Sequence, residues 1–258
     1  MTKAVGSPDW FRERAKESLN VIHDRQTSQS RREFTEKYAP GKLAAMDGEE
    51  LLNHVFGNGH TMLYDLMEDE DKYRKFGAAG KYKYNRIIYC DRDGIWKYKR
   101  GKNSREVTRH EASERAIEIR DQLLLIMKHL YDVKKLDTLT EYKLLEKKIS
   151  SVFFYKYTWA LKYYQMFFPQ WFPCMYSDFT LTRAVDILGL DNHGNDRFAN
   201  FAEMGLFVQR CDVGSVLMAH IYGTHWGWEE TRSTCEAAKQ NWNDSRMSIS
   251  SYRAKYQM

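Results

Sequence analysis

Residues 81–100, KYKYNRIIYCDRDGIWKYKR, decide how the middle of the chain folds. Two runs in this stretch, residues 81–89 and 95–100, are rich in tyrosine, isoleucine and tryptophan. Such residues favour β-strands, and the polar tetrapeptide Asp91–Gly94 between the runs is typical of a turn. We therefore predict an antiparallel β-hairpin in the centre of the chain.

The two faces of this hairpin depend on whether its loop has an even or an odd number of residues. An even-numbered loop would place Tyr89 opposite Trp96 and Ile87 opposite Tyr98, which would give an apolar face for the core. The other face would then be basic and exposed to solvent, with Tyr82, Tyr84, Arg86, Ile88, Lys97 and Lys99. An odd-numbered loop would reverse one strand and mix the two sets.

A helical pattern follows the hairpin. Apolar residues recur at spacings of 4, 3, 4, 3 and 4, at Ala112, Ala116, Ile119, Leu123, Ile126 and Leu130. This stripe predicts a helix that ends near Tyr131 and covers the apolar face of the hairpin. Thr108 and Glu111 have the spacing of a capping box, which predicts where the helix begins.

Other helices are predicted on both sides of this region. The residues expected to cap helices are Ser7, Asp47, Thr61 and Ser177. We expect residues 26–31 to form a polar loop and Pro40–Gly41 to break a helix. The predicted helices cover residues 8–24, 32–38, 136–149, 153–168, 177–189, 195–210 and 212–222, with two more beginning after Asp47 and Thr61.

These elements predict an α+β fold that is predominantly helical, with a small central antiparallel β-hairpin or sheet. We expect an N-terminal helical segment at residues 1–70, a main α+β domain at 71–228 and a polar C-terminal extension at 229–258. The main domain would contain the basic hairpin and an aromatic helical core. Trp159, Tyr163 and Phe167 share one helical face and are predicted to lie in that core.

The segment from Lys72 to Arg109 is strongly basic. It holds 13 Lys and Arg but three Asp and Glu, in a chain of formal net charge +5, and the acidic run Glu68–Asp71 precedes it. Cations at this density, interleaved with aromatic rings, are typical of proteins that neutralise phosphates and stack bases. We predict nucleic-acid binding, with DNA as the expected ligand, by Lys81, Lys83, Tyr84, Arg86, Lys97, Lys99, Arg100, Lys102 and Arg105.

Two alternative functions fit parts of the same pattern. The basic hairpin is also typical of a solvated surface whose lysines discourage edge pairing, in which case the protein is a scaffold for a protein partner. Salt separates these hypotheses, because phosphate binding weakens steeply with salt and an apolar interface does not. A less favoured alternative is a ribonuclease: Arg105 and His110 have an R-x4-H spacing that resembles HEPN-type ribonucleases, although the family motif lies within a helix and this one lies at a predicted helix start.

Signals for metals and cofactors are weak. His220 and His225 lie five residues apart with Cys211 and Cys235 nearby in sequence, but the tight ligand pairs of zinc sites are missing. We interpret these residues as structural. The sequence has no P-loop, G-x-S-x-G or H-E-x-x-H motif. We therefore expect no catalysis, no cofactor and no metal site.

The sequence also indicates a compartment. No stretch approaches the roughly 18 apolar residues of a membrane-spanning helix, and Met1–Trp10 lacks the apolar stretch of a secretory signal. The four cysteines lie far apart, which favours free thiols in a reducing environment. We expect a cytoplasmic protein without a membrane partner.

The order of several short motifs resembles a known family. The motifs are Glu49–Leu52, Met62–Glu68, Phe76–Gly77, Lys83–Tyr84, Gly94–Trp96, Glu111–Ala112, Ala116, Arg120–Asp121, Trp159–Tyr163 and Phe168–Pro169. Across residues 32–225 this order resembles the N-terminal region ahead of the AAA+ motor in some McrB-like restriction proteins.

The resemblance implies a recognition module of an antiviral defence system of the restriction type. In such systems the module reads DNA, often modified DNA, and a ring-shaped AAA+ motor recruits a nuclease subunit. This sequence lacks the motor, so the motor and the nuclease would be partners on other chains, or the sequence would be part of a longer motor protein. The resemblance supplies no residue-level signature of base recognition, and the predicted binding residues therefore rest on charge and pattern.

Overall fold

The computed structural model describes residues 4–18, 24–58, 61–67, 72–77, 86–100 and 103–226. Within these ranges the protein is predominantly helical and contains one three-stranded antiparallel sheet. This arrangement confirms the predicted α+β fold class. The polar C-terminal extension expected at residues 229–258 lies outside the described residues.

The N-terminal part is a series of short helices. They are α1 (Pro8–Ser18), α2 (Asp24–Lys37), α3 (Pro40–Ala45), α4 (Gly48–Leu51), the π-helical turn η1 (Leu52–Phe56), α5 (Met62–Met67) and the 3-10 turn η2 (Arg74–Phe76). The predicted loop at residues 26–31 is wrong, because these residues belong to α2, which buries Thr27, Ser30 and Phe34 at helical spacing. Pro40 begins α3, since its fixed φ and missing N–H suit a first helical turn.

The helix starts predicted from capping residues are confirmed. The Ser7 hydroxyl accepts a hydrogen bond from the Trp10 N–H at 3.2 Å. Asp47 and Glu50 form a reciprocal capping box at the start of α4. At α7 the Thr108 hydroxyl accepts from the Glu111 N–H at 3.1 Å. Each of these bonds satisfies a backbone donor that a helix leaves free at its N-terminus.

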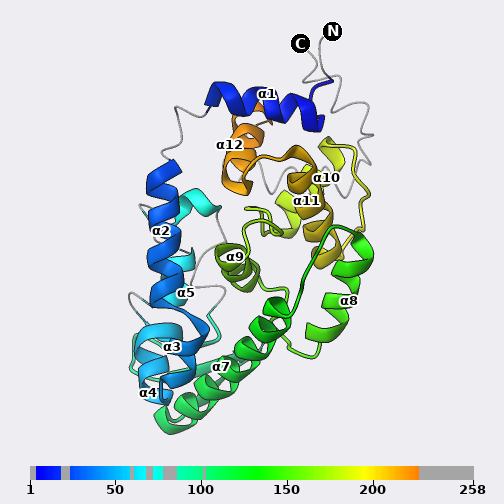
Figure 1. The fold of residues 1–258 in the computed structure, drawn as a ribbon. Helices are drawn as coiled ribbons and strands as arrows, with labels where there is room; N and C mark the ends of the chain where they lie inside the picture. Colours follow the sequence, from blue (N-terminus) through cyan, green and yellow to red (C-terminus); the bar gives the residue numbers. More distant parts are fainter. Residues whose placement is uncertain are drawn as a thin grey trace.

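Six further helices follow the strands in the described chain. They are α7 (Arg109–Tyr131), α8 (Leu139–Ile149), α9 (Thr158–Phe167), α10 (Asp178–Ile187), α11 (Arg197–Cys211) and α12 (Ser215–Trp226). All six residues of the apolar stripe predicted for α7 are buried, and the helix ends at Tyr131 as expected. Figure 1 shows α9 in the centre of the molecule, between α2 and α5 on one side and α11 on the other.

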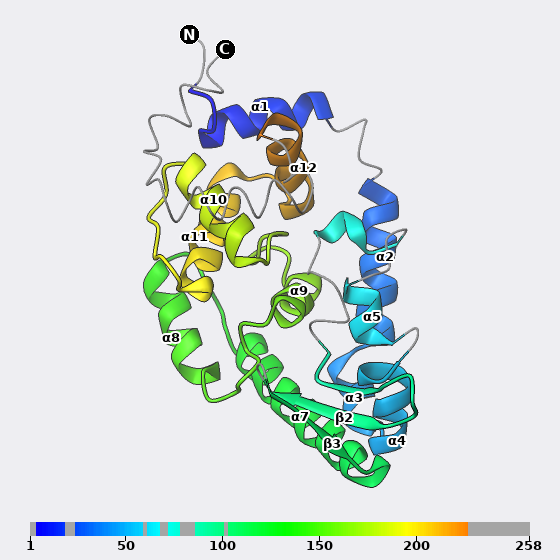
Figure 2. The ribbon, with the colours of Figure 1, turned by 180° about the vertical axis from the view of Figure 1, so that it is seen from behind.

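The sheet is a meander of three short strands, β1 (Ile88–Cys90), β2 (Trp96–Arg100) and β3 (Asn103–Val107), in the order β1-β2-β3. The sequence predicted the first two strands and missed the third, whose residues Asn103–Glu106 are polar and exposed. Both β1 and β2 contact α7, which confirms that this helix covers one face of the hairpin. Figure 2 shows β2 and β3 lying along α7.

The predicted register of the hairpin is wrong by one residue. The strands pair Ile88 with Tyr98 and Cys90 with Trp96, so the connecting loop has the odd number of residues from Asp91 to Ile95. Strand β1 is therefore reversed relative to the prediction. Its buried Ile88 shares a face with Trp96 and Tyr98, and Tyr89 lies opposite Lys97 on the other face.

Aromatic side chains of α9 lie at the centre of the core. Trp159 and Tyr163 are fully buried, and the ring of Tyr163 contacts Phe34 of α2 and Phe167. This confirms the predicted core position of Trp159 and Tyr163, while Phe167 is half-buried at the helix end. The core thus joins the N-terminal helices to the C-terminal ones through one central helix.

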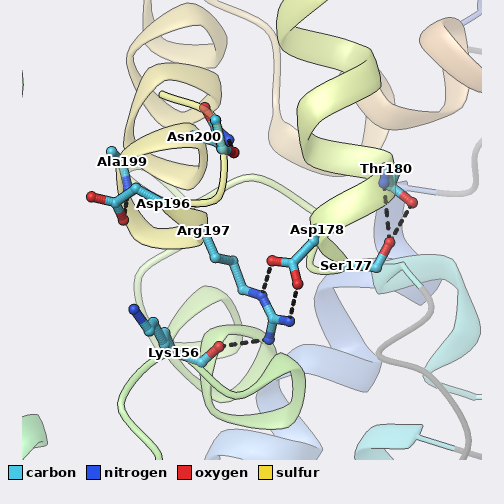
Figure 3. A network of polar contacts seen from close by, with 9 residues as sticks. Lys156, Ser177, Asp178, Thr180, Asp196, Arg197, Ala199 and Asn200 are labelled. Carbon is cyan, nitrogen blue, oxygen red and sulfur yellow. Dashed lines mark hydrogen bonds and ion pairs between the residues drawn. The ribbon is translucent and has the colours of Figure 1, made fainter. Parts of the chain in front are cut away.

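A polar network fixes the starts of α10 and α11 relative to each other. Figure 3 shows Arg197, the first residue of α11, with its guanidinium against both carboxylate oxygens of Asp178 in α10. The same group donates to the backbone oxygen of Lys156 at 2.9 Å. Ser177 and Asp196 cap the two helices. These contacts are confined to helix ends and satisfy their backbone groups, which indicates a structural role.

Trp159→Ala should lower the free energy of unfolding by about 3–5 kcal/mol, because it removes a large, fully buried ring from the central helix. Chemical denaturation followed by circular dichroism would measure this decrease. Leu144→Ala is the matched control, since Leu144 is 57% exposed and its truncation should change stability by less than about 0.5 kcal/mol. A similar, small effect of both substitutions would contradict the assignment of Trp159 to the core.

Candidate nucleic-acid interface

The structure places five of the nine predicted binding residues on or beside the β-meander: Arg86, Lys97, Lys99, Arg100 and Arg105. The other four, Lys81, Lys83, Tyr84 and Lys102, lie outside the described residues, as do Tyr82 and the acidic run Glu68–Asp71. The described part of the candidate interface is therefore the meander itself together with the start of α7.

One sheet face points away from α7 and carries Tyr89, Lys97, Lys99, Ser104 and Glu106; we call it the outer face. Alternation along each strand and the pairing of β2 with β3 put these residues together. The hydroxyls of Tyr89 and Ser104 lie 3.4 Å apart across the face. The guanidinium carbon of Arg86 lies 4.0 Å from the centre of the Tyr89 ring, so a cation and a ring stack at its margin.

The opposite face brings a second set of cations to the rim between the sheet and the helices. Trp96 and Tyr98 are half-buried there, and Arg105 and Arg115 each place a guanidinium 5.8 Å from the Tyr98 ring. Arg100 lies 5.0 Å from the ring of Phe153. Lys97 and Lys99 thus lie on one face, and Arg100 and Arg105 lie on the other.

Sequence reasoning missed two cations of this rim. Arg109 lies 5.7 Å from the Trp96 ring, and Arg115 contacts Tyr98 from the second turn of α7. Both belong to a helix whose predicted role was to cover the sheet, so no sequence signal distinguished them from ordinary surface arginines. The described residues 86–100 and 103–109 hold seven Lys and Arg against three Asp and Glu, which keeps the meander basic.

Carboxylates on neighbouring elements neutralise part of this charge. The Lys97 ammonium lies 2.6 Å from Glu106 and 3.6 Å from Asp91, and Arg105 pairs with Glu111. Arg109 binds Glu49 of α4 at 2.6 Å. The hydrogen bonds from these arginines hold the pKa values of Glu111 and Glu49 below the usual range. The carboxylates therefore stay ionised at neutral pH, and a bound phosphate would have to compete with them.

Asp91 sets the geometry of the β1–β2 loop. Its carboxylate accepts hydrogen bonds from the backbone N–H of Ile95 at 2.9 Å and of Asp93 at 3.0 Å. These backbone donors, together with the Lys97 ammonium, lower the pKa of Asp91. Gly94 has a φ of +79°, a left-handed conformation that glycine adopts without strain. The loop length follows from this side-chain cap.

The segment before the meander is anchored on α9. Lys162 is buried, and its ammonium donates to the backbone oxygens of Tyr73 at 2.9 Å and Gly77 at 2.7 Å. The Tyr176 hydroxyl donates to the Phe76 oxygen at 2.5 Å. Gly77 has a φ of +85°, and a Cβ there would lie 2.2 Å from the Cys174 oxygen. Residues 73–77, near the start of the basic segment, are therefore held against α9 and Tyr176.

Arg105 and His110 are not joined within one helix. Arg105 lies in β3, whereas His110 is the second residue of α7 and is 85% exposed. Each contacts a different carboxylate: Arg105 pairs with Glu111, and the His110 ring lies 3.5 Å from Glu114. The pair thus departs from the geometry of the HEPN motif, in which both residues lie within a helix.

No group of three or more His, Cys, Asp and Glu residues that could hold a metal ion occurs in the described ranges. His220 and His225 line an open groove of about 270 Å³ between α1 and α12, beside Trp10 and Arg14. Burial, and then Arg14, lower the pKa of His225. Cys90, Cys174 and Cys211 are free thiols, and Cys235 lies outside the described residues.

Comparison with protein-family models, with curated proteins and with solved structures gave no match to this chain. In the part of the chain that the structure describes, no helix is long and apolar enough to cross a membrane.

The Asp91 carboxyl should titrate below the ordinary Asp value of about 3.9, because its ionised form accepts two backbone hydrogen bonds. A lowered pKa in the folded state means that the carboxylate stabilises the loop above the unfolded-state pKa, and that this contribution disappears as the pH falls through the folded-state pKa. An NMR titration of the carboxyl carbon measures the midpoint. The control variant Asp91→Asn keeps an oxygen acceptor and should remove the acid-dependent shift of the Ile95 N–H signal. A titration midpoint of Asp91 at or above the ordinary Asp pKa would contradict the prediction.

Proposed function

We propose that the protein is a non-catalytic nucleic-acid-binding module whose contact surface is the β-meander, with DNA as the expected ligand. The observation that carries this proposal is the excess of cations on the described meander, seven Lys and Arg against three Asp and Glu, interleaved with aromatic rings. Phosphate groups attract such a surface at any base sequence, so binding is expected to depend strongly on salt.

The two faces of the sheet supply different contacts. On the outer face, Lys97 and Lys99 follow each other along β2, where a backbone that runs along this strand would meet both, and Tyr89 offers a ring to an unstacked base. On the rim, the guanidinium groups of Arg100 and Arg105 lie near rings, and Arg105 also bonds Glu111, with which a phosphate would compete. A nucleic acid that follows the edge of the sheet would meet both sets.

The resemblance to the N-terminal region of McrB-like restriction proteins supports DNA as the ligand and a place in a cytoplasmic defence system. Under this proposal the module reads the target, and an AAA+ motor and a nuclease on other polypeptide segments act on it. The chain's own residues would bind and position DNA without cutting it. Nothing in the meander arrangement distinguishes one base sequence from another, so modification or shape is the property it would read.

Replacing Lys97 and Lys99 with Gln should weaken binding and reduce the dependence of log K on log salt by about 0.7–0.9 for each phosphate that the protein no longer neutralises. Fluorescence anisotropy with a labelled duplex DNA, the corresponding single strand and the corresponding RNA, each at two salt concentrations, would measure both quantities. Glutamine keeps a polar side chain beside Glu106, so the melting temperature should change little.

Lys147→Gln and Lys148→Gln, on the exposed face of α8, form the matched control because they remove the same charge elsewhere. The meander pair should weaken binding much more than the α8 pair. Equal weakening by both pairs would show a response to net charge alone and would contradict a meander site. If the unaltered protein binds none of the three probes at about 50 mM salt, the nucleic-acid proposal fails.

A further inference from the structure

The outer edge of β3 has backbone groups available for another strand. The backbone N–H of Lys99 donates to the oxygen of Ile87, and that of Asp91 donates to the oxygen of Ile95, so odd-numbered residues of β2 face β1. Because successive backbone groups point to opposite sides, Tyr98 and Arg100 face β3 and bond Arg105 and Asn103. Ser104 and Glu106 of β3 must then direct their N–H and C=O groups away from the sheet.

These outward groups have no hydrogen-bond partner among the described residues. Residues Asn103–Glu106 are all exposed, and the strand order β1-β2-β3 puts β3 on the side of β2 away from β1. The other edge of the sheet differs, since the Asn58 side chain donates to the backbone oxygen of Cys90 and Ile88 is buried against η1. Among the described residues, one edge of the sheet is covered and the other has no neighbouring strand.

Charged side chains often protect an exposed edge from pairing, but those of β3 are compensated within the chain. Glu106 binds Lys97 on the outer face, and Arg105 binds Glu111 beside α7. Each ion pair weakens the repulsion that its charged residue would exert on an incoming strand. Arg105 bonds Glu111 through one terminal nitrogen, and its other guanidinium donors have no partner among the described residues.

We propose that β3 binds an extended segment of a partner protein, which adds antiparallel to the sheet as a fourth strand and places an acidic side chain opposite Arg105. The outward groups of Ser104 and Glu106 would form four backbone hydrogen bonds with this segment. The carboxylate opposite Arg105 would accept from the guanidinium donors that Glu111 leaves unused. The backbone edge of β3 is separate from the side chains proposed to contact nucleic acid, except for Arg105, which belongs to both sites.

A second copy of the chain fits the same edge poorly. Antiparallel self-pairing opposes the outward residues of the two copies, and two of the three such registers bring like charges together. Pairing Ser104 with Glu106 sets Arg105 directly against the second copy of Arg105. Pairing Glu106 with its second copy opposes two carboxylates. Like charges at directly opposed positions destabilise a sheet, so a partner of different sequence with an acidic residue is the better complement.

The test uses a ten-residue peptide of alternating Thr and Val with Lys-Asp-Thr at its centre, so that Lys, Asp and Thr face Glu106, Arg105 and Ser104. In NMR titrations of the full chain, the amide signals of Ser104 and Glu106 should shift, and their hydrogen exchange should slow, with a Kd of about 0.1–1 mM because only a few net bonds form. A peptide with Lys and Asp exchanged should bind about tenfold more weakly, and Arg105→Gln should remove this preference.

Ser104→Pro is the blocking variant, since it deletes an outward N–H and spares the bonds between β2 and β3. It should abolish peptide binding and leave nucleic-acid binding unchanged, because it alters no charge. An unchanged melting temperature and unchanged amide signals of β2 would show that the sheet remains. If either changes, the blocking test with Ser104→Pro is replaced by a test that combines Ser104→Gly with a peptide whose backbone is N-methylated. Peptide binding that survives the blocked edge, shifts confined to other residues, or dimerisation abolished by Ser104→Pro would each overturn the proposal.

Discussion

One buried ammonium group, that of Lys162, joins the central helix α9 to the start of the basic segment. Lys162 projects from the central helix α9 and donates to backbone oxygens of the segment that leads into the basic region. A charge can be buried only when hydrogen bonds replace its hydration, so the position of Lys162 and the path of residues 73–77 depend on each other. Contacts with α7 and η1 then place the meander on the protein.

The parts of the fold that the sequence predicted are those determined by neighbouring residues. The apolar stripe of α7 and the caps at Ser7, Asp47 and Thr108 are local patterns, and the structure has them at the expected positions. The register of the hairpin could not be predicted in the same way, because the loop length depends on whether Asp91 caps Ile95. Strand β3 escaped prediction since its exposed polar residues carry no alternating apolar pattern.

In the candidate interface, too, the sequence predicts local features but not long-range contacts. Charge density directed attention to the meander, and five of the predicted binding residues lie on or beside it. The strand register decides which of those cations lie on which face of the sheet. The packing of α4 and α7 against the sheet decides which carboxylates they meet: Arg109 pairs with Glu49, and Arg105 pairs with Glu111. Such long-range pairs have no sequence signal. They change a simple basic patch into a surface where carboxylates and ligands compete for the same arginines.

The contact between the first and last described helices has a consequence for synthesis of the chain. Trp10 and Phe11 of α1 are buried against Trp226 of α12 and Phe207 of α11. While the ribosome is still translating the middle of the message, these two rings have nothing to pack against. Their partner rings follow about two hundred residues later, so α1 cannot complete its packing until α11 and α12 have been synthesised, and until then its two rings are a surface that a chaperone can bind.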